Sequence, residues 1–171
     1  SLRNEEAMNQ CPLLEKFFDR IPGFISAGIS KLEAGAEIQW HTGDTSGVVR
    51  CHFPINVPKS LPECGFQVEE EERSWKEGEM LLFCDAHRHR AFNHTEKDRI
   101  MLMIDVVNPA YSQKKKSIIA NALSILWLQR ILLRVKMLKK SPGLIKGAVR
   151  RGCLVFIYLY LPFKRSKKQG N

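Results

Sequence analysis

The five histidines of this 171-residue chain all lie between positions 41 and 94. Imidazole is the most common protein ligand of transition metals, and a β-sheet can bring histidines that are distant in sequence to one ion. The pattern His87-x-His89 has two interpretations, either two ligands on one strand face or a solvated strand edge. The histidines therefore indicate a metal site, but their spacing alone does not select the ligands. The candidates are His41, His52, His87, His89 and His94.

Two segments direct basic side chains to one face of the predicted β-structure. In residues 48–53, strand alternation places Arg50 and His52 on the same face. In residues 98–107, Arg99 lies on the face opposite a row of apolar residues. A positive charge inside a small barrel is costly unless it meets an anion. The two segments therefore indicate an interior that binds an anion.

Short runs of β-branched, aromatic and apolar residues follow one another between positions 24 and 107. Turn residues separate these runs and no helical periodicity intervenes, which disfavours a doubly wound α/β sheet. We expect a mainly β fold of the sandwich or barrel type, such as a jelly roll, preceded by a short helix near Pro12. The acidic run 69–72 is expected to be a solvated turn. The expected strands are 24–32, 37–40, 48–57, 66–69, 80–83 and 99–107.

The charges of the chain are divided sharply near position 105. Up to Asp105 there are 12 Lys or Arg against 18 Asp or Glu, whereas the remainder has 15 Lys or Arg and no acid. We therefore expect a β-domain over residues 1–110 and a basic, apolar helical tail over 111–171. Residues 117–138 contain no Pro or Gly, which predicts one long helix that is amphipathic in its second half.

The tail is predicted to bind an anionic membrane surface. A second apolar run, 154–163, has basic residues at both ends, as interfacial segments do. The alternative is that the helices cover the β-domain and the lysines only keep the protein soluble. Nucleic acid is not an expected partner, because the basic residues lack interleaved base-stacking aromatics.

We expect membrane association without an ordinary transmembrane helix, because no run of about twenty apolar residues is present. The cytoplasmic side is favoured by a polar N-terminus that lacks a signal peptide. Five cysteines, few and odd in number, also fit a reducing compartment. The chain does not begin with Met, which leaves room for an upstream anchor.

The order of these residues resembles the aspartyl/asparaginyl β-hydroxylase family of dioxygenases, which includes lipid A hydroxylase-like members. The resemblance extends from about position 11 to about 109 and does not cover the basic tail. It implies a double-stranded β-helix (jelly roll), an Fe(II) ion, 2-oxoglutarate as co-substrate, and O2. The matching residues are Trp40-His41-Thr42-Gly43 with Thr45, Arg50-Cys51-His52, Trp75-Lys76-Glu77-Gly78, Leu82-Phe83, Asp85, His89, Arg99, and Ile104-Asp105-Val106 with Pro109.

The resemblance also implies roles for individual residues. His41 and His89 match the two iron ligands, and Arg99 matches the arginine that pairs with the distal carboxylate of 2-oxoglutarate. A permanently charged, planar guanidinium suits that bidentate task. The remaining residues, which match groups that hold the co-substrate or line its pocket, are Ser30, Arg50 and His52.

The third iron ligand of most related oxygenases, a carboxylate two residues after the first histidine, is replaced here by Gly43. The resembled family also lacks this carboxylate, and water fills the position. Asp44 is the alternative ligand, although it lies one residue further on in a turn. His87 competes with His89, but only His89 has the spacing to Arg99 that the family shows.

The predicted function is hydroxylation of a C–H bond in a peptide Asp or Asn side chain, or in the acyl chain of a membrane lipid. Cys84 and Arg88 stand where the family commonly has acids, and a more positive rim favours an anionic substrate. One alternative is a non-catalytic jelly-roll module that binds an acidic peptide or a lipid headgroup. Another is a zinc or nickel cupin that uses His41, His87 and His89.

Overall fold

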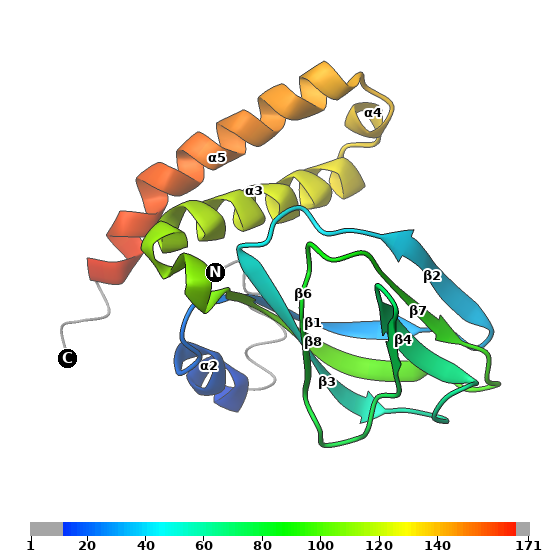
Figure 1. Ribbon diagram of the computed structural model, residues 1–171. Coiled ribbons are helices and arrows are strands. Elements are labelled where there is room, and N and C mark those ends of the chain that lie inside the picture. Colours follow the sequence, from blue (N-terminus) through cyan, green and yellow to red (C-terminus); the bar gives the residue numbers. More distant parts are fainter. Residues whose placement is uncertain (1–11, 167–171) are drawn as a thin grey trace. The chain divides into compact units, whose positions relative to one another are not determined.

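Residues 12–166 are described by the computed structural model, and they divide into two compact units (Figure 1). The unit that extends to Gln113 is built of β-strands preceded by one helix, and the unit that begins at Lys114 is helical. The polar N-terminal residues and the last basic residues considered above lie outside the described range.

The described β-unit contains two four-stranded antiparallel sheets, with strand orders β1-β8-β3-β6 and β2-β7-β4-β5. Most neighbouring strands are not consecutive in the chain, so the polypeptide crosses repeatedly between the sheets, as in a jelly roll. The predicted mainly β, double-stranded β-helix fold is therefore confirmed. The strands are β1 (Phe24–Leu32), β2 (Ala36–His41), β3 (Val48–Asn56), β4 (Cys64–Val68), β5 (Glu71–Arg73), β6 (Leu81–Cys84), β7 (His89–Asn93) and β8 (Arg99–Val107).

Two of these strands differ from the sequence-based expectation. The acidic run 69–72 is not all turn, because Glu71 and Glu72 belong to β5, which pairs with β4. This strand is short, exposed and charged, as is common at a sheet edge. β7, which begins at His89, was not predicted because its five residues combine charged, polar and apolar types without alternation.

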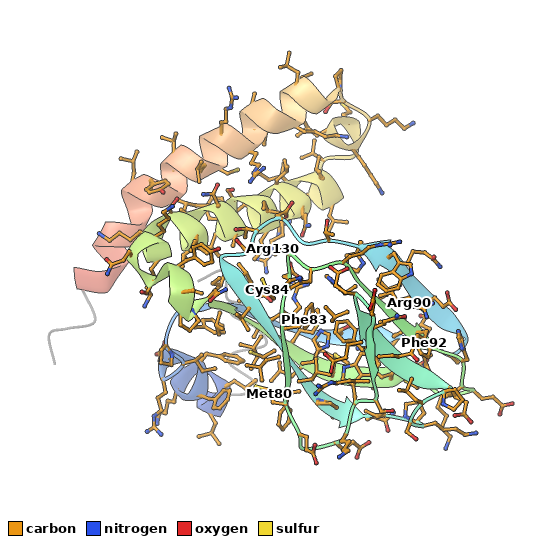
Figure 2. The ribbon with its side chains drawn as sticks, viewed as in Figure 1. Met80, Phe83, Cys84, Arg90, Phe92 and Arg130 are labelled. Atoms are coloured by element: carbon orange, nitrogen blue, oxygen red, sulfur yellow. The ribbon has the colours of Figure 1, made fainter. Side chains whose placement is uncertain are left out.

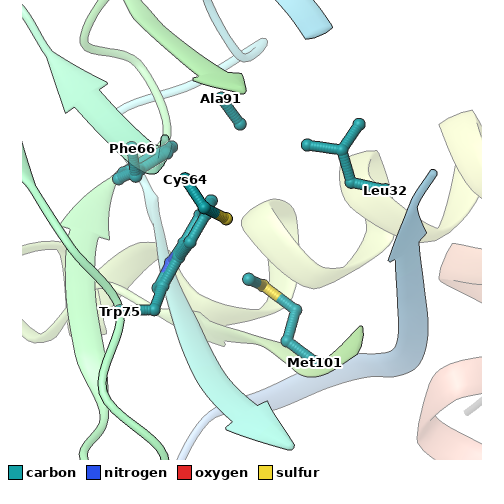
Figure 3. Packing of buried hydrophobic residues seen from close by; sticks show 6 residues of the cluster. All are labelled: Leu32, Cys64, Phe66, Trp75, Ala91 and Met101. Carbon is teal, nitrogen blue, oxygen red and sulfur yellow. The ribbon is translucent and has the colours of Figure 1, made fainter. Parts of the chain in front are cut away.

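The core between the two sheets joins residues from both of them (Figure 3). Its members are Leu32, Cys64, Phe66, Trp75, Ala91 and Met101. Trp75 comes from the segment between β5 and β6 and is 3% exposed, so it fills the interior without belonging to a strand. Burial of such large side chains is the main source of stability in a fold of this size.

The outer face of the β1-β8-β3-β6 sheet is covered by α2 (Pro12–Asp19). Phe18 of this helix packs in one cluster with Cys51 and Ile104, and its ring stacks on Phe24 at a centroid distance of 4.9 Å. The predicted N-terminal helix is thus present. Because Cys51 and Ile104 point outward, strand alternation turns their neighbours on β3 and β8 toward the interior.

The C-terminal unit is a helical hairpin of α3 (Lys115–Arg134) and α5 (Gly143–Ser166), which follows a 3₁₀ turn at Pro109–Lys114. Leu123 of α3 packs against Ile157 of α5. The predicted single helix over 117–138 is wrong, because α3 ends at Arg134 and the short α4 (Lys136–Lys139) begins after Val135. Val135 has φ −109° and ψ 86°, which lies outside the helical region.

The expectation that no segment is apolar enough to cross a membrane also needs correction. The helical stretch Pro109–Arg134 spans 26 residues and contains a window of mean hydropathy 1.3, which suffices by length and composition alone. An unbroken apolar run of that length is absent from this stretch, so the sequence pattern does not indicate it. Ser, Asn and Gln interrupt the run without adding charge.

Candidate active site

Two predicted site histidines, distant in sequence, meet where β2 ends and β7 begins. His41 is the last residue of β2, His89 is the first residue of β7, and the two are paired in register. Their ring centroids lie 4.1 Å apart with an interplanar angle of 58°. The structure therefore brings together the two histidines that the resemblance singled out, whose role as iron ligands stays a prediction.

Both rings of this pair are oriented by the backbone in the same way. Nδ1 of His41 lies 2.8 Å from the carbonyl oxygen of Gln39, and Nδ1 of His89 lies 2.7 Å from that of His87. A carbonyl oxygen only accepts, so each Nδ1 donates and each Nε2 keeps a free lone pair. Metal-binding histidines are typically held in this tautomer. Burial further lowers the pKa of His89, which favours the neutral ring.

His52, on β3, has the opposite tautomer. Trp75 Nε1 donates a hydrogen bond to Nδ1 of His52 over 3.2 Å, so the proton of the neutral ring resides on Nε2. Burial, with the nearby charge of Arg99, lowers the pKa of His52 to about 3. His52 is therefore a neutral hydrogen-bond donor at physiological pH, suited to an anionic or carbonyl oxygen.

Arg99 is a buried cation, 2% exposed, at the start of β8. Its Cζ lies 4.7 Å from the centroid of the Trp75 ring, and its Nη1 donates a long hydrogen bond of 3.5 Å to Ser30 Oγ. Its Nε has no hydrogen-bond partner, and no ion pair to Arg99 occurs within residues 12–166. Burial lowers the pKa of Arg99 to about 10. An uncompensated buried guanidinium is expensive, and a bound anion would offset that cost.

Aromatic rings connect the histidine pair with His52. Phe83 lies 4.9 Å from His89 and 5.0 Å from His52, measured between ring centroids. Phe66 lies 5.8 Å from His89 and 4.9 Å from His52. Phe66 and Phe83 thus link the buried His89, whose partner His41 is exposed, to the buried His52. Trp75 in turn contacts both His52 and the buried guanidinium of Arg99.

Arg50 points into the same interior but is already paired with acids. Its Nε and Nη2 donate to the two carboxylate oxygens of Asp105 at 2.8 and 3.1 Å. Its Nη1 forms an ion pair with Asp85 Oδ1 at 2.9 Å. The angles of this contact are not those of a hydrogen bond, and Asp85 Oδ1 accepts no hydrogen bond from residues 12–166. The predicted pocket residue Arg50 is therefore present at the site, with its charge compensated by two carboxylates.

Asp85 is a site residue to which the sequence analysis gave no role. Its Oδ1 lies 3.9 Å from His89 Nε2, and its backbone oxygen accepts a 2.7 Å hydrogen bond from the amide of Gly43. A Cβ placed on Gly43 would come within 1.9 Å of Asp85 Oδ2. Asp85 therefore fills the space of the absent side chain at 43. The signal was visible in sequence as an acid four residues before the second histidine.

The side chains of His87 and His94 contact acids outside this pair. His87 is exposed, and its Nδ1 lies 3.8 Å from Glu69 Oε1. His94 is exposed and lies 2.6 Å from Glu37. Within residues 12–166, no group of three or more His, Cys, Asp or Glu side chains is arranged to hold a metal ion. A cupin site built from three histidines has no support in this arrangement.

A cavity of about 660 Å³ is lined by Phe66 and Phe83, the two rings next to His89, and by the exposed His87. Met80 and Cys84, which are labelled with Phe83 in Figure 2, also line this cavity. The apolar wall is completed by Leu61, Val68, Leu81 and Leu82. The charged residues at the cavity are Glu71, Glu72, Arg73, Lys76 and Glu79.

The fold and the site define a jelly-roll protein with a histidine pair and a buried arginine that forms no ion pair within residues 12–166. Residues 1–109 match the family model described as aspartyl/asparaginyl beta-hydroxylase, which is more than half of the chain. The chain belongs to this family. The resemblance inferred from the ordered motifs is thereby confirmed.

Curated relatives have moderate identity and much greater length. An ornithine lipid ester-linked acyl 2-hydroxylase from Rhizobium tropici is 34% identical over 111 residues, which is 65% of this chain and 40% of that protein. The mouse aspartyl/asparaginyl beta-hydroxylase is 30% identical over 113 residues, which is 64% of this chain and 15% of that protein. The chain thus spans less than half the length of these relatives.

Among solved structures, the cupin domain of an XRE-family transcriptional regulator from Enterobacter cloacae is similar to this chain. The TM-score is 0.43, with 16% identity, over 53% of this chain and 88% of that chain. Similarity at this level supports no inference about function.

Proposed function

We propose that this protein is an Fe(II)- and 2-oxoglutarate-dependent dioxygenase that hydroxylates a C–H bond. The observation that supports the proposal is that one β-unit contains both a histidine pair suited to a metal and a buried arginine suited to an anion. At one end, Nδ1 of both His41 and His89 is held by a backbone carbonyl, and Asp85 Oδ1 lies 3.9 Å from His89 Nε2. At the other end, Arg99 lies buried and forms no ion pair with an acid of residues 12–166. Membership of a family named for hydroxylation supports the same reaction class.

The donor set fits both iron and 2-oxoglutarate. Neutral imidazoles suit Fe(II), and the orphaned Nε of Arg99 suits a carboxylate. 2-Oxoglutarate has a 2-oxo acid end that can chelate a metal and a second carboxylate at its far end. When bound, the iron, the co-substrate and O2 would supply the oxidation: one oxygen atom would enter the substrate C–H bond, and the other would enter the succinate formed from 2-oxoglutarate with loss of CO2.

Each chain residue then has a simple task. Arg99 and Ser30 hold the distal carboxylate, and His52 Nε2–H donates to a co-substrate oxygen. Phe66 and Phe83 keep water away from the space between the two ends. These tasks require that each side chain is held in a defined position. The strands hold them there through backbone hydrogen bonds to neighbouring strands and through packing in the core.

The substrate we propose is the acyl chain of a membrane lipid, with a peptide Asp or Asn side chain as the second candidate. The acyl chain is favoured by the apolar wall of the cavity, where Phe66, Met80 and Leu82 offer contacts that a carboxylate side chain does not need. The name of the Rhizobium relative, which states acyl 2-hydroxylation of a lipid, supports the same choice.

The test is 2-oxoglutarate turnover by the purified full chain with Fe(II), ascorbate and O2. Lipid vesicles and an Asp- or Asn-containing peptide are supplied separately, and succinate and the hydroxylated product are quantified. His41→Ala is expected to abolish both products, whereas His94→Ala, a change at an exposed histidine paired with Glu37, should leave them within about twofold. Absence of succinate under all these conditions would refute the dioxygenase; coupling to the peptide alone would exclude the acyl chain.

A further inference from the structure

The turn of the C-terminal hairpin, residues 133–145, carries large apolar side chains on its surface. We call this segment the hairpin tip. Leu133, Met137 and Leu144 are 76%, 86% and 87% exposed, respectively. Val135 and Ile145 in the same segment are 42% and 45% exposed. Isolated exposed apolar residues are common, but five such residues within one turn of the chain require an explanation.

The hairpin does not use these side chains for its own packing. Its core contains Ala120, Leu123 and Ile157, and the Trp127 and Phe156 rings lie 5.5 Å apart beside it. The apolar residues of the tip belong to none of the described core clusters. Folding of the hairpin therefore leaves the tip available for another surface.

The charges around the tip indicate what that surface is. Arg130 (labelled on α3 in Figure 2), Arg134, Lys139 and Lys140 are all exposed. The sequence contains no Asp or Glu after Asp105, so no acid of this unit neutralises them. Exposed apolar side chains surrounded by cations suit the interface of an anionic bilayer. The apolar side chains can enter the acyl region, and the cations can contact the lipid phosphates.

We propose that the hairpin tip docks on anionic lipid membranes, with Leu133, Met137 and Leu144 inserted into the interface. Long Lys and Arg side chains can keep their charges at headgroup level while the helix end is immersed. In this proposal the hairpin lies at the interface, with Ala120 and Leu123 of α3 packed in one cluster with Ile157 of α5. This inference is independent of the proposed function, since it requires neither iron nor 2-oxoglutarate.

The test is flotation of the full chain with vesicles of phosphatidylcholine, alone or with phosphatidylglycerol. The expected result is binding to the anionic vesicles that weakens with salt. Met137→Ser/Leu144→Ser should reduce partitioning about tenfold or more, since two exposed apolar anchors are lost. Lys139→Gln/Lys140→Gln should also reduce it, by about fivefold per lysine.

The matched control is Ile29→Ser/Ile55→Ser, which changes two exposed apolar residues of the β-unit, outside the helical hairpin. This variant should bind within about twofold of the parent, and circular dichroism should show unchanged helix content in all variants. The proposal is overturned by equal losses in the tip and control variants, by equal binding to neutral vesicles, or by resistance to alkaline carbonate extraction. Binding to poly-glutamate without vesicle binding would overturn it as well.

Discussion

Trp75 donates its indole N–H to Nδ1 of His52 over 3.2 Å, while its ring lies under the guanidinium of Arg99 at 4.7 Å. One side chain therefore sets the tautomer of a neutral donor and supports a buried cation. The histidine pair carries the opposite tautomer, fixed by backbone carbonyl groups. The tautomer of His41 and His89 suits metal binding through Nε2, whereas the tautomer of His52 suits donation from Nε2–H to an oxygen atom. These two properties together fit a ligand with a metal-chelating end and an anionic end.

Trp75→Phe should separate these two tasks, because the ring remains under Arg99 but the donor is lost. The buried Nδ1 of His52 would lose its partner, which should lower the free energy of unfolding by about 1–3 kcal/mol. The KM for 2-oxoglutarate should rise about tenfold, with a smaller change in kcat. Trp40→Phe, at a tryptophan that stacks with Arg88 away from Arg99, is the control and should leave this KM unchanged.

Arg99→Met should have opposite effects on stability and on binding. Removal of a buried, unpaired charge in favour of an apolar side chain of similar length should leave the unfolding free energy equal or raise it by about 1–2 kcal/mol. The affinity for 2-oxoglutarate should fall about 100-fold, because the distal carboxylate loses a charge-assisted partner. Urea denaturation and calorimetric titration measure the two effects. A large loss of stability with unchanged 2-oxoglutarate affinity would assign Arg99 a purely structural role.

His52 should make stability depend on pH in the acidic range. Its pKa is about 3 in the folded protein and about 6.5 in the unfolded chain, so the unfolded state binds the proton first as the pH falls. The contribution of the neutral His52 ring to the free energy of unfolding is complete above about pH 6.5, and it is lost progressively as the pH falls toward 3. Between pH 7 and 5 the unfolding free energy should fall by about 2 kcal/mol. His52→Gln should remove this part of the slope in denaturation curves at the two pH values; an unchanged slope would contradict the assignment.

Gly43→Ala should disturb the site through Asp85. The new Cβ would lie 1.9 Å from Asp85 Oδ2, so the carboxylate that pairs with Arg50 must move. We expect a loss of about 1–3 kcal/mol in unfolding free energy, as for other overpacked sites, together with weaker metal binding. Gly28→Ala is the matched control, because nothing lies within 4 Å of a Cβ at that position. Similar effects of the two substitutions would exclude the steric explanation.

The strands that position the site could largely be predicted from sequence. The limits of β1 and β8 agree with the expected ranges, because both are runs of apolar and β-branched residues bounded by turn residues. The same alternation correctly directed His52 and Arg99 inward. Ser30 lies opposite Met101 in the register and reaches Arg99, as the resemblance implied for two residues that act together.

Other parts of the structure depend on tertiary contacts that leave weak local signals. β7 forms because His89 and its neighbours pair with β2 and β4, although its residues do not alternate. Trp75 belongs to no strand, so its hydrogen bond to His52 could not be derived from periodicity. α3 ends at Arg134 without a glycine or proline, and the chain turns because α5 returns to pack against it.

The most direct test of the central claim is anaerobic calorimetric titration of the full chain with 2-oxoglutarate, with and without Fe(II) or Mn(II). Histidines that hold the metal and an arginine that holds the distal carboxylate predict binding that needs the metal. This binding should be lost in His41→Ala and His89→Ala, weakened about 100-fold in Arg99→Met, and retained in His87→Ala. Equal binding of 2-oxoglutarate by the parent chain and by the two ligand variants would contradict the claim.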